Sequence, residues 1–233
     1  MDTVLDYVFS RKPSKVFDMK HIHFDFFDDT EVELHWIPSV SATPSRNRRL
    51  RHFYNSHSEV FDNSLFIDSE RKIVAASPRF NAVYLLQHIQ GHFLYEGIGL
   101  RQLMDYYFTL IHLDENDRIE VMDDIKYLGL KKILSAVMYV MQTVFGIEKM
   151  YLLCEPSIES GNELLKEIMM GGNFGHYSKE NRVKNESVTH WAWKRMKRRV
   201  KLIQYDSMSI VFRPIYRIKV SLVKSLVIRR YGI

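Results

Sequence analysis

The sequence predicts a mostly helical α+β protein, in which a small antiparallel sheet is followed by a helical bundle and a basic, partly helical tail. Two segments near the N-terminus alternate apolar and polar residues with the period of a β-strand. Most later apolar residues recur with helical spacing. Residues 182–233 hold 14 Lys and Arg against two acidic residues, whereas residues 1–181 hold 19 basic and 26 acidic residues. We therefore expect a partial sheet region over 1–76, a helical domain over 77–180 and a basic tail over 181–233.

The composition limits the class of protein. Apolar residues make up 46% of the 233 positions and charged residues 26%, which is typical of a globular protein and excludes disordered or low-complexity chains. The single cysteine, Cys154, excludes a disulfide framework, and its apolar neighbours predict a buried thiol rather than a nucleophile. No signal peptide is evident, and the uncharged stretch 133–147 is shorter than the ~20 residues of a membrane-spanning helix, so we expect a cytoplasmic protein.

The first two predicted elements form an antiparallel hairpin. Residues 21–27 and 31–37 alternate with period 2 and flank the turn residues 28–30. Alternation places the apolar residues on one face: Ile22, Phe24, Phe26, Val32, Leu34 and Trp36. The other face carries a polar set: His21, His23, Asp25, Glu31, Glu33 and His35. This arrangement predicts a register with Phe27 opposite Glu31, because a one-residue slip would mix the two faces.

The later elements follow from helix and turn signals. Residues 38–61 contain two prolines and several arginines and indicate a loop or weak helix. Two short strands are expected at 64–68 and 73–76. Ser77 and Pro78 provide an N-cap and a first helical residue. Further helices are expected from apolar spacing and glycine breaks over 100–113, 117–128, 131–145, 158–170, 191–203 and 214–229.

The polar face of the hairpin is the first candidate site. Its carboxylates, Asp25 and Glu33, suit a hard cation such as Mg²⁺. Its imidazoles, His21, His23 and His35, suit zinc or another transition metal. The alternative is a solvated outer face of a sheet whose inner face is apolar. The pattern alone leaves both interpretations open.

Two further candidates lie in the predicted helices. His88 and His92 are four residues apart, which places two imidazoles on one helix face, as in helical metal sites. The alternative is a structural pair bonded to neighbouring backbone or aromatic groups. Arg101 and Asp105 have the same spacing, which is typical of an ion pair within a helix. Alternatively, Arg101 binds an anionic ligand and Asp105 orients it.

The basic tail interleaves aromatic residues with cations. Trp191 and Trp193 are followed by six Lys or Arg residues up to Lys201. A later predicted helix has an apolar stripe: Ile215, Ile218, Leu222 and Leu226. Such patterns are typical of a helix lying on anionic lipid or of a contact with nucleic-acid phosphates. The alternative is a tail that docks on the acidic body of its own chain.

Five segments, taken in order, resemble the later part of an uncharacterised nucleotidyltransferase family of the DNA polymerase β-like superfamily. They are VELHWIPS (32–39), LLQHIQGHFLYEGIGLRQLMDYY (85–107), YLGLKKIL (127–134), VFGIE (144–148) and MMGGNFGHY (169–177). The resemblance covers roughly residues 15–180. It implies that the small sheet is the remnant of a nucleotidyltransferase fold, with helices packed against it.

The resemblance also implies transfer of a nucleotidyl group from an NTP to an unknown acceptor, with two Mg²⁺ ions aligning the triphosphate. Glu33 would be the third metal-binding carboxylate, and Asp25 is the other metal candidate. The family's Asp-x-Asp pair should precede Glu33 by several dozen residues, but only 32 residues precede it and none carries that pattern. Asp25 and Asp28 are three residues apart and point to opposite faces of a strand.

We therefore expect a truncated family member that is inactive alone and does not bind Mg²⁺ tightly by itself. The expected partner is a complementing N-terminal half that completes it, or a second copy of the chain that covers the apolar sheet face left exposed by the missing part. The alternative is a non-catalytic binding module, peripheral to the membrane, whose basic tail contacts an anionic membrane, a nucleic acid or a protein partner.

Overall fold

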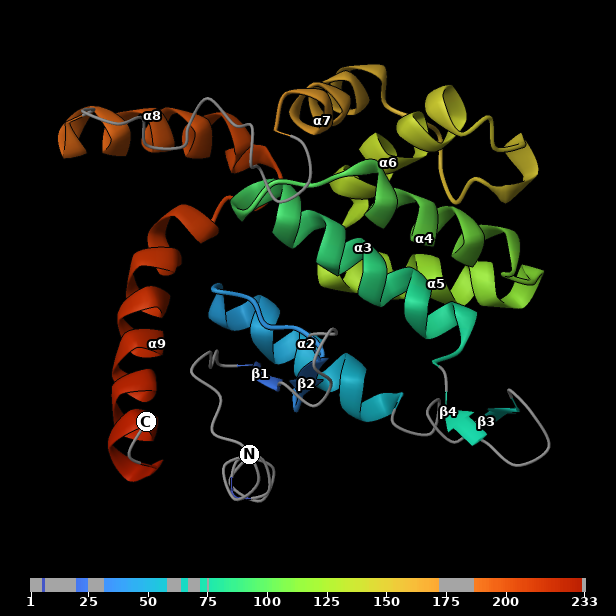
Figure 1. The fold of residues 1–233 in the computed structure, drawn as a ribbon. Helices are drawn as coiled ribbons and strands as arrows, with labels where there is room; N and C mark the ends of the chain where they lie inside the picture. Colours follow the sequence, from blue (N-terminus) through green and yellow to red (C-terminus); the bar gives the residue numbers. More distant parts are fainter. Residues whose placement is uncertain are drawn as a thin grey trace. The chain divides into compact units, whose positions relative to one another are not determined.

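The structure, a computed structural model, describes residue 6 and residues 20–24, 32–57, 64–66, 72–74, 76–171 and 187–231. The chain divides into two compact units, residues 1–47 with 208–233 and residues 48–207. The described parts are mostly helical and include two small antiparallel hairpins, which confirms the predicted mostly helical α+β class (Figure 1). The expected division at residues 76 and 180 stays a prediction.

The first hairpin pairs β1 (His21–Phe24) with β2 (Val32–His35). Ile22 lies opposite Leu34 in the ladder, so the predicted apolar and polar sets keep their separate faces. The predicted register is wrong by two residues, since it would have placed Phe24 opposite Leu34, whereas Phe24 pairs with Val32. An even slip returns every side chain to its own face, so alternation cannot detect it. The predicted turn and its flanks, residues 25–31, lie outside the described residues.

The second hairpin pairs β3 (Ser64–Phe66) with β4 (Lys72–Val74), which confirms the two short strands expected there. Between the hairpins, the segment expected to be a loop or weak helix contains α2 (Pro44–Ser56). Tertiary packing anchors this helix, because Leu50 and Phe53 are only 1% and 2% exposed. The ring of Phe53 stacks on Phe80 of the next helix, with centroids 5.7 Å apart.

Five helices supply most of the described core of the unit 48–207. They are α3 (Pro78–Tyr95), α4 (Leu100–Ile111), α5 (Glu115–Leu128), α6 (Lys131–Val144) and α7 (Ile158–Gly171), with the short 3₁₀ helix η2 (Lys149–Tyr151) before α7 (Figure 1). The predicted helix ends are confirmed at two places. Ser77 Oγ accepts a hydrogen bond from the Phe80 amide, and Gly129 ends α5 with a φ of 71°, which favours glycine.

The regularly spaced apolar side chains of these helices point into one shared core. Its fully buried side chains include Leu86, Ile89, Phe93, Leu103, Tyr106, Leu110, Ile125, Leu128, Ile133, Leu134, Val137 and Leu164. The core packs α6 against α7, and α3 against α4 and α5. Burial of this apolar stripe, rather than helix propensity alone, stabilises such helices.

Three elements follow near the C-terminus. The helix α8 (Val188–Lys201) and the 3₁₀ helix η4 (Leu202–Gln204) belong to the unit 48–207, and α9 (Ser209–Tyr231) belongs to the other unit. We expected α9 to start at Pro214, but this proline lies inside the helix. The helix begins earlier because the carbonyl of Met208 accepts hydrogen bonds from the amides of Phe212 and Val211, at 3.1 and 3.2 Å, which form its first turn. No described helix is both long and apolar enough to cross a membrane.

Candidate functional site

Three residues predicted for the polar hairpin face meet at the end of β1 and β2 away from the turn. His21 is the register partner of His35, and Glu33 lies two residues before His35 on the same strand. All three therefore share one face of the ladder. One ligand atom from each of them lies within 4.8 Å of the others. Asp25, the remaining metal candidate, lies outside the described residues.

Contacts within this cluster, called the hairpin cluster below, are close but open to solvent. His35 Nε2 lies 3.0 Å from Glu33 Oε2, and the rings of His21 and His35 have centroids 4.8 Å apart. The side chains of Glu33 and His35 remain 47% and 27% exposed. The Trp36 amide donates to the Lys20 carbonyl at 3.1 Å, so the ladder extends one pair beyond His21 and His35. The backbone thus holds the cluster from both sides, while its side chains can still meet an ion from solution.

The donor atoms of the hairpin cluster decide which ion it fits. Mg²⁺ requires oxygen ligands in a near-octahedral arrangement and is bound through carboxylates, phosphates and water. Imidazole nitrogen suits Zn²⁺, Cu²⁺, Ni²⁺ or Fe²⁺ instead. Two imidazoles with one carboxylate therefore do not fit the two-Mg²⁺ arrangement that the family resemblance implies.

The histidine pair of α3 forms a chain of polar contacts. His92 Nε2 lies 2.9 Å from His88 Nε2, and His92 Nδ1 lies 3.2 Å from Glu96 Oε2. Since two facing imidazole nitrogens make a hydrogen bond only when one donates and the other accepts, the ring tautomers are linked. His88 also stacks on Tyr84, with ring centroids 5.9 Å apart. The stacking of His88 on Tyr84 is the kind of aromatic contact that the structural alternative expected, and metal binding by the pair stays a prediction.

Arg101 and Asp105 lie on α4, and both are exposed. Within the described part of the chain, no hydrogen bond or ion pair joins their side chains. The spacing alone therefore does not produce the intrahelical pair that it suggested. Both residues belong to the unit 48–207, whereas the hairpin cluster belongs to the other unit.

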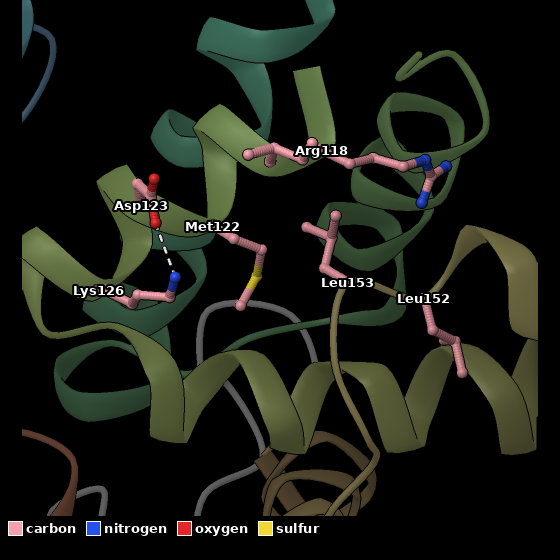
Figure 2. A pocket seen from close by; sticks show the side chains of 7 residues that line it. Arg118, Met122, Asp123, Lys126, Leu152 and Leu153 are labelled. Carbon is pink, nitrogen blue, oxygen red and sulfur yellow. Dashed lines mark hydrogen bonds and ion pairs between the residues drawn. The ribbon is translucent and has the colours of Figure 1, made fainter. Parts of the chain in front are cut away.

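An open pocket of about 370 Å³ lies between α5 and the segment after η2 (Figure 2). Its lining is Arg118, Ile119, Met122, Asp123, Lys126, Leu152 and Leu153. Asp123 accepts a hydrogen bond from Lys126 Nζ at 2.7 Å, and Arg118 donates to the Leu110 carbonyl at 2.8 Å. Each charged group lining the pocket therefore has a partner within the protein. None of the residues that the sequence singled out lines it.

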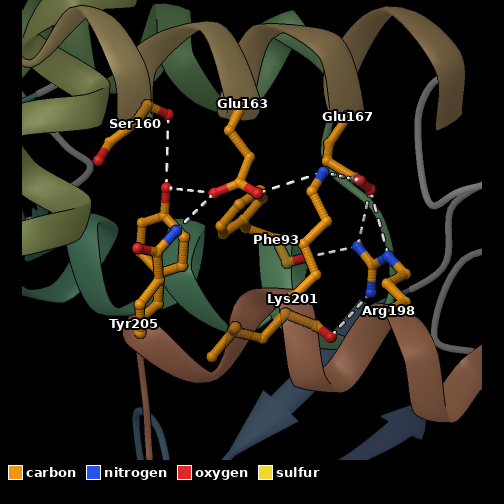
Figure 3. Close-up of polar contacts among 9 residues, drawn as sticks. Phe93, Ser160, Glu163, Glu167, Arg198, Lys201 and Tyr205 are labelled. Atoms are coloured by element: carbon orange, nitrogen blue, oxygen red, sulfur yellow. Dashed lines mark hydrogen bonds and ion pairs between the residues drawn. The ribbon is translucent and has the colours of Figure 1, made fainter.

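The sequence reasoning missed a polar network that joins α8 to α7 and α3 (Figure 3). Arg198 donates to Glu167 Oε2 at 3.0 and 3.2 Å. It also donates to the carbonyls of Phe93 and Leu94, at 2.7 and 3.0 Å. Lys201 Nζ lies 3.2 Å from Glu163 Oε1. Part of the basic tail therefore docks on the acidic body of its own chain.

The residues after α8 extend this network. Glu163 Oε2 accepts hydrogen bonds from Gln204 Nε2 and Tyr205 Oη, both at 2.9 Å. Burial and the hydrogen bond to Glu163 raise the pKa of Tyr205 above its ordinary value. The sequence contains a pattern that could have indicated this network. Glu163 and Glu167 are four residues apart on α7, and Arg198 and Lys201, which they contact, are three residues apart on α8.

Two further titratable groups lie in this helical unit. Cys154 is half-buried, and burial followed by the charge of Glu155 raises the pKa of its thiol to about 11. Tyr106 is fully buried in the core, and burial raises its pKa above the ordinary range. Both groups therefore stay protonated near neutral pH, so neither is activated as a nucleophile.

Comparison with known proteins gives a family match. A family model described as uncharacterised nucleotidyltransferase matches residues 5–146, which include the hairpin cluster and the helices α2 to α6. The match ends before the MMGGNFGHY segment, α8 and α9. No curated protein and no solved structure gives a significant match. Since the model covers more than half of the 233 residues, this chain belongs to the uncharacterised nucleotidyltransferase family.

Proposed function

We propose that this chain takes part in transferring a nucleotidyl group from an NTP to an acceptor, with Glu33 as one carboxylate of the reaction centre. The observation that carries the proposal is the position of Glu33. It lies on the polar face of β2, 47% exposed, inside the segment that matches the family. Catalysis of this class depends on positioning the triphosphate and on charge stabilisation by cations held between carboxylates.

One carboxylate is too few for that task. The hairpin cluster supplies a single carboxylate. We therefore propose that the chain is inactive alone and that a second polypeptide contributes the missing carboxylates. The proposed nucleotidyl transfer is then shared between two chains, and this chain supplies Glu33.

Complementation tests this proposal. A family member that has the Asp-x-Asp pair, but whose own third carboxylate is replaced by alanine, is mixed with this chain, Mg²⁺ and labelled NTPs. We expect label transfer with the wild-type chain and none with Glu33→Gln. Glu155→Gln is the matched control, because Glu155 is an exposed carboxylate outside the hairpin. No transfer in any mixture, or equal transfer with Glu33→Gln, would contradict the proposed role.

A second candidate function is attachment to an anionic membrane surface through α9. The apolar stripe predicted for this helix is exposed, since Ile215, Ile218, Leu222 and Leu226 are between 60% and 64% exposed. The helix carries six Lys or Arg residues and no acidic residue. An exposed apolar stripe on a helix with only positive charges complements a bilayer with anionic headgroups.

Vesicle co-sedimentation tests the membrane candidate. We expect the chain to bind phosphatidylserine-containing vesicles, to bind neutral phosphatidylcholine vesicles less, and to be released by high salt. Replacing both Ile218 and Leu222 with Asp should abolish binding. Ile119→Asp is the matched control, since Ile119 is 61% exposed on α5. Binding that persists in the double variant, or binding to RNA but not to vesicles, would overturn this candidate.

A further inference from the structure

We propose that the hairpin cluster of His21, Glu33 and His35 binds a single transition-metal ion, with Zn²⁺ as the best fit. The antiparallel ladder places His21 directly opposite His35, and strand alternation brings Glu33 to the same face. One ligand atom from each residue lies within 4.8 Å of the others. This inference does not rest on the proposed nucleotidyl transfer, although Glu33 is common to both.

The distances are within reach of a tetrahedral site. Zinc bonds of about 2.0–2.2 Å to nitrogen and oxygen set neighbouring ligand atoms roughly 3.3 Å apart. The separations in the hairpin cluster, at most 4.8 Å, must therefore shorten by no more than about 1.5 Å. Side-chain rotation can supply this movement, because Glu33 and His35 are partly exposed. The strand backbone does not need to move.

The donor set also selects the ion. Two neutral imidazoles and one carboxylate match the three protein ligands of an open zinc site, which leaves the fourth position for water or another oxygen donor. The single negative charge of Glu33 offsets part of the charge of a divalent ion. His35 Nδ1 is shielded from water and has no hydrogen-bond partner among the described residues, so this imidazole is not fully satisfied by the contact with Glu33.

The backbone preorganises the site. The ladder continues through the bond from the Trp36 amide to the Lys20 carbonyl, so the residues that carry both histidines are held on each side. Strand pairing already restricts the backbone of the ligand residues, so metal binding loses less conformational entropy than it would in an unpaired chain. In return, the bound ion should stabilise the pairing of β1 with β2, because it links both strands.

Metal titration tests the inference directly. Untagged protein, stripped with a chelator, is titrated with Zn²⁺ alone and with Mg²⁺ alone by calorimetry. We expect one Zn²⁺ per chain and no measurable Mg²⁺ binding. His35→Ala and Glu33→Gln should each weaken Zn²⁺ binding by more than about 100-fold. Co²⁺ in the same site should give the visible absorption of a tetrahedral complex.

Control variants separate this site from the histidine pair of α3. His190→Ala removes an exposed histidine on α8, and the double change at His88 and His92 removes the α3 pair. Neither should alter Zn²⁺ affinity. Circular dichroism of each stripped variant establishes that it folds. Zinc binding that survives His35→Ala but is lost without His88 and His92, or no Zn²⁺ binding by the folded wild-type chain, would overturn the inference whatever the outcome of the transfer assay.

Discussion

Replacing Arg198 with methionine should loosen α8 from the helical unit. The guanidinium donates to Glu167 and to the carbonyls of Phe93 and Leu94, and only 14% of the side chain is exposed. Those carbonyls belong to the last turn of α3, where carbonyls lack partners within the helix. Methionine keeps much of the aliphatic packing and removes every donor, so the change isolates the polar contribution.

The expected loss follows from these contacts. Hydrogen bonds to charged groups contribute about 1.5–3 kcal/mol each, and breaking a fully buried ion pair costs about 3–5 kcal/mol. Glu167 is 25% exposed and regains some water, so we expect Arg198→Met to lower the free energy of unfolding by about 2–3 kcal/mol. Lys201→Met is the matched control. Lys201 is 50% exposed, so its loss should cost less than about 1 kcal/mol.

Urea unfolding followed by circular dichroism measures both variants, and hydrogen exchange locates the change. We expect faster exchange in α8 of Arg198→Met than in that of Lys201→Met, because the anchor of the helix is gone. A double-mutant cycle with Glu167→Gln should show coupling between the two residues. An Arg198→Met protein within about 0.5 kcal/mol of wild type, or no less stable than Lys201→Met, would refute the argument that this network holds α8.

Two further predictions concern packing and thiol reactivity. Gly161→Ala should lower the free energy of unfolding in urea by about 1–3 kcal/mol, because the added methyl group would overlap Tyr139 where α6 packs on α7. Gly91→Ala should raise it by up to about 1 kcal/mol, because its methyl group would meet open space and alanine favours the helix. Equal effects would contradict this packing. Cys154 should react with iodoacetamide at pH 8 about 100-fold more slowly than an ordinary thiol, and the rate should rise as the pH approaches the raised pKa of about 11. A rate equal to that of the urea-unfolded chain would contradict the effect of burial.

Local signals in the sequence were sufficient for much of the fold. Ser77 with Pro78 fixes where α3 begins, and Gly129 fixes where α5 ends, because each depends on one residue's own backbone preferences. The alternation of residues 21–24 and 32–35 predicts both hairpin faces, and so brings His21, Glu33 and His35 together. These features need no knowledge of distant contacts.

Other features depend on residues far apart in the sequence and were not predictable. The predicted hairpin register was wrong by two residues, because a shift by two residues leaves the alternation of faces unchanged. The segment of α2 was expected to be a loop or weak helix because most of its residues are polar, and the burial of Leu50 and Phe53 anchors it as a helix. Arg198 appeared as one cation among many, since its partners lie 31, 104 and 105 residues away.

We propose that this family member supplies one carboxylate and does not complete a nucleotidyl-transfer centre alone. The most direct measurement is an assay of the purified 233-residue chain with Mg²⁺, each labelled NTP and a panel of protein, RNA and small-molecule acceptors. We predict no label transfer by the chain alone, because Glu33 cannot organise two Mg²⁺ ions. Transfer that is lost in Glu33→Gln and kept in Glu155→Gln would contradict the account.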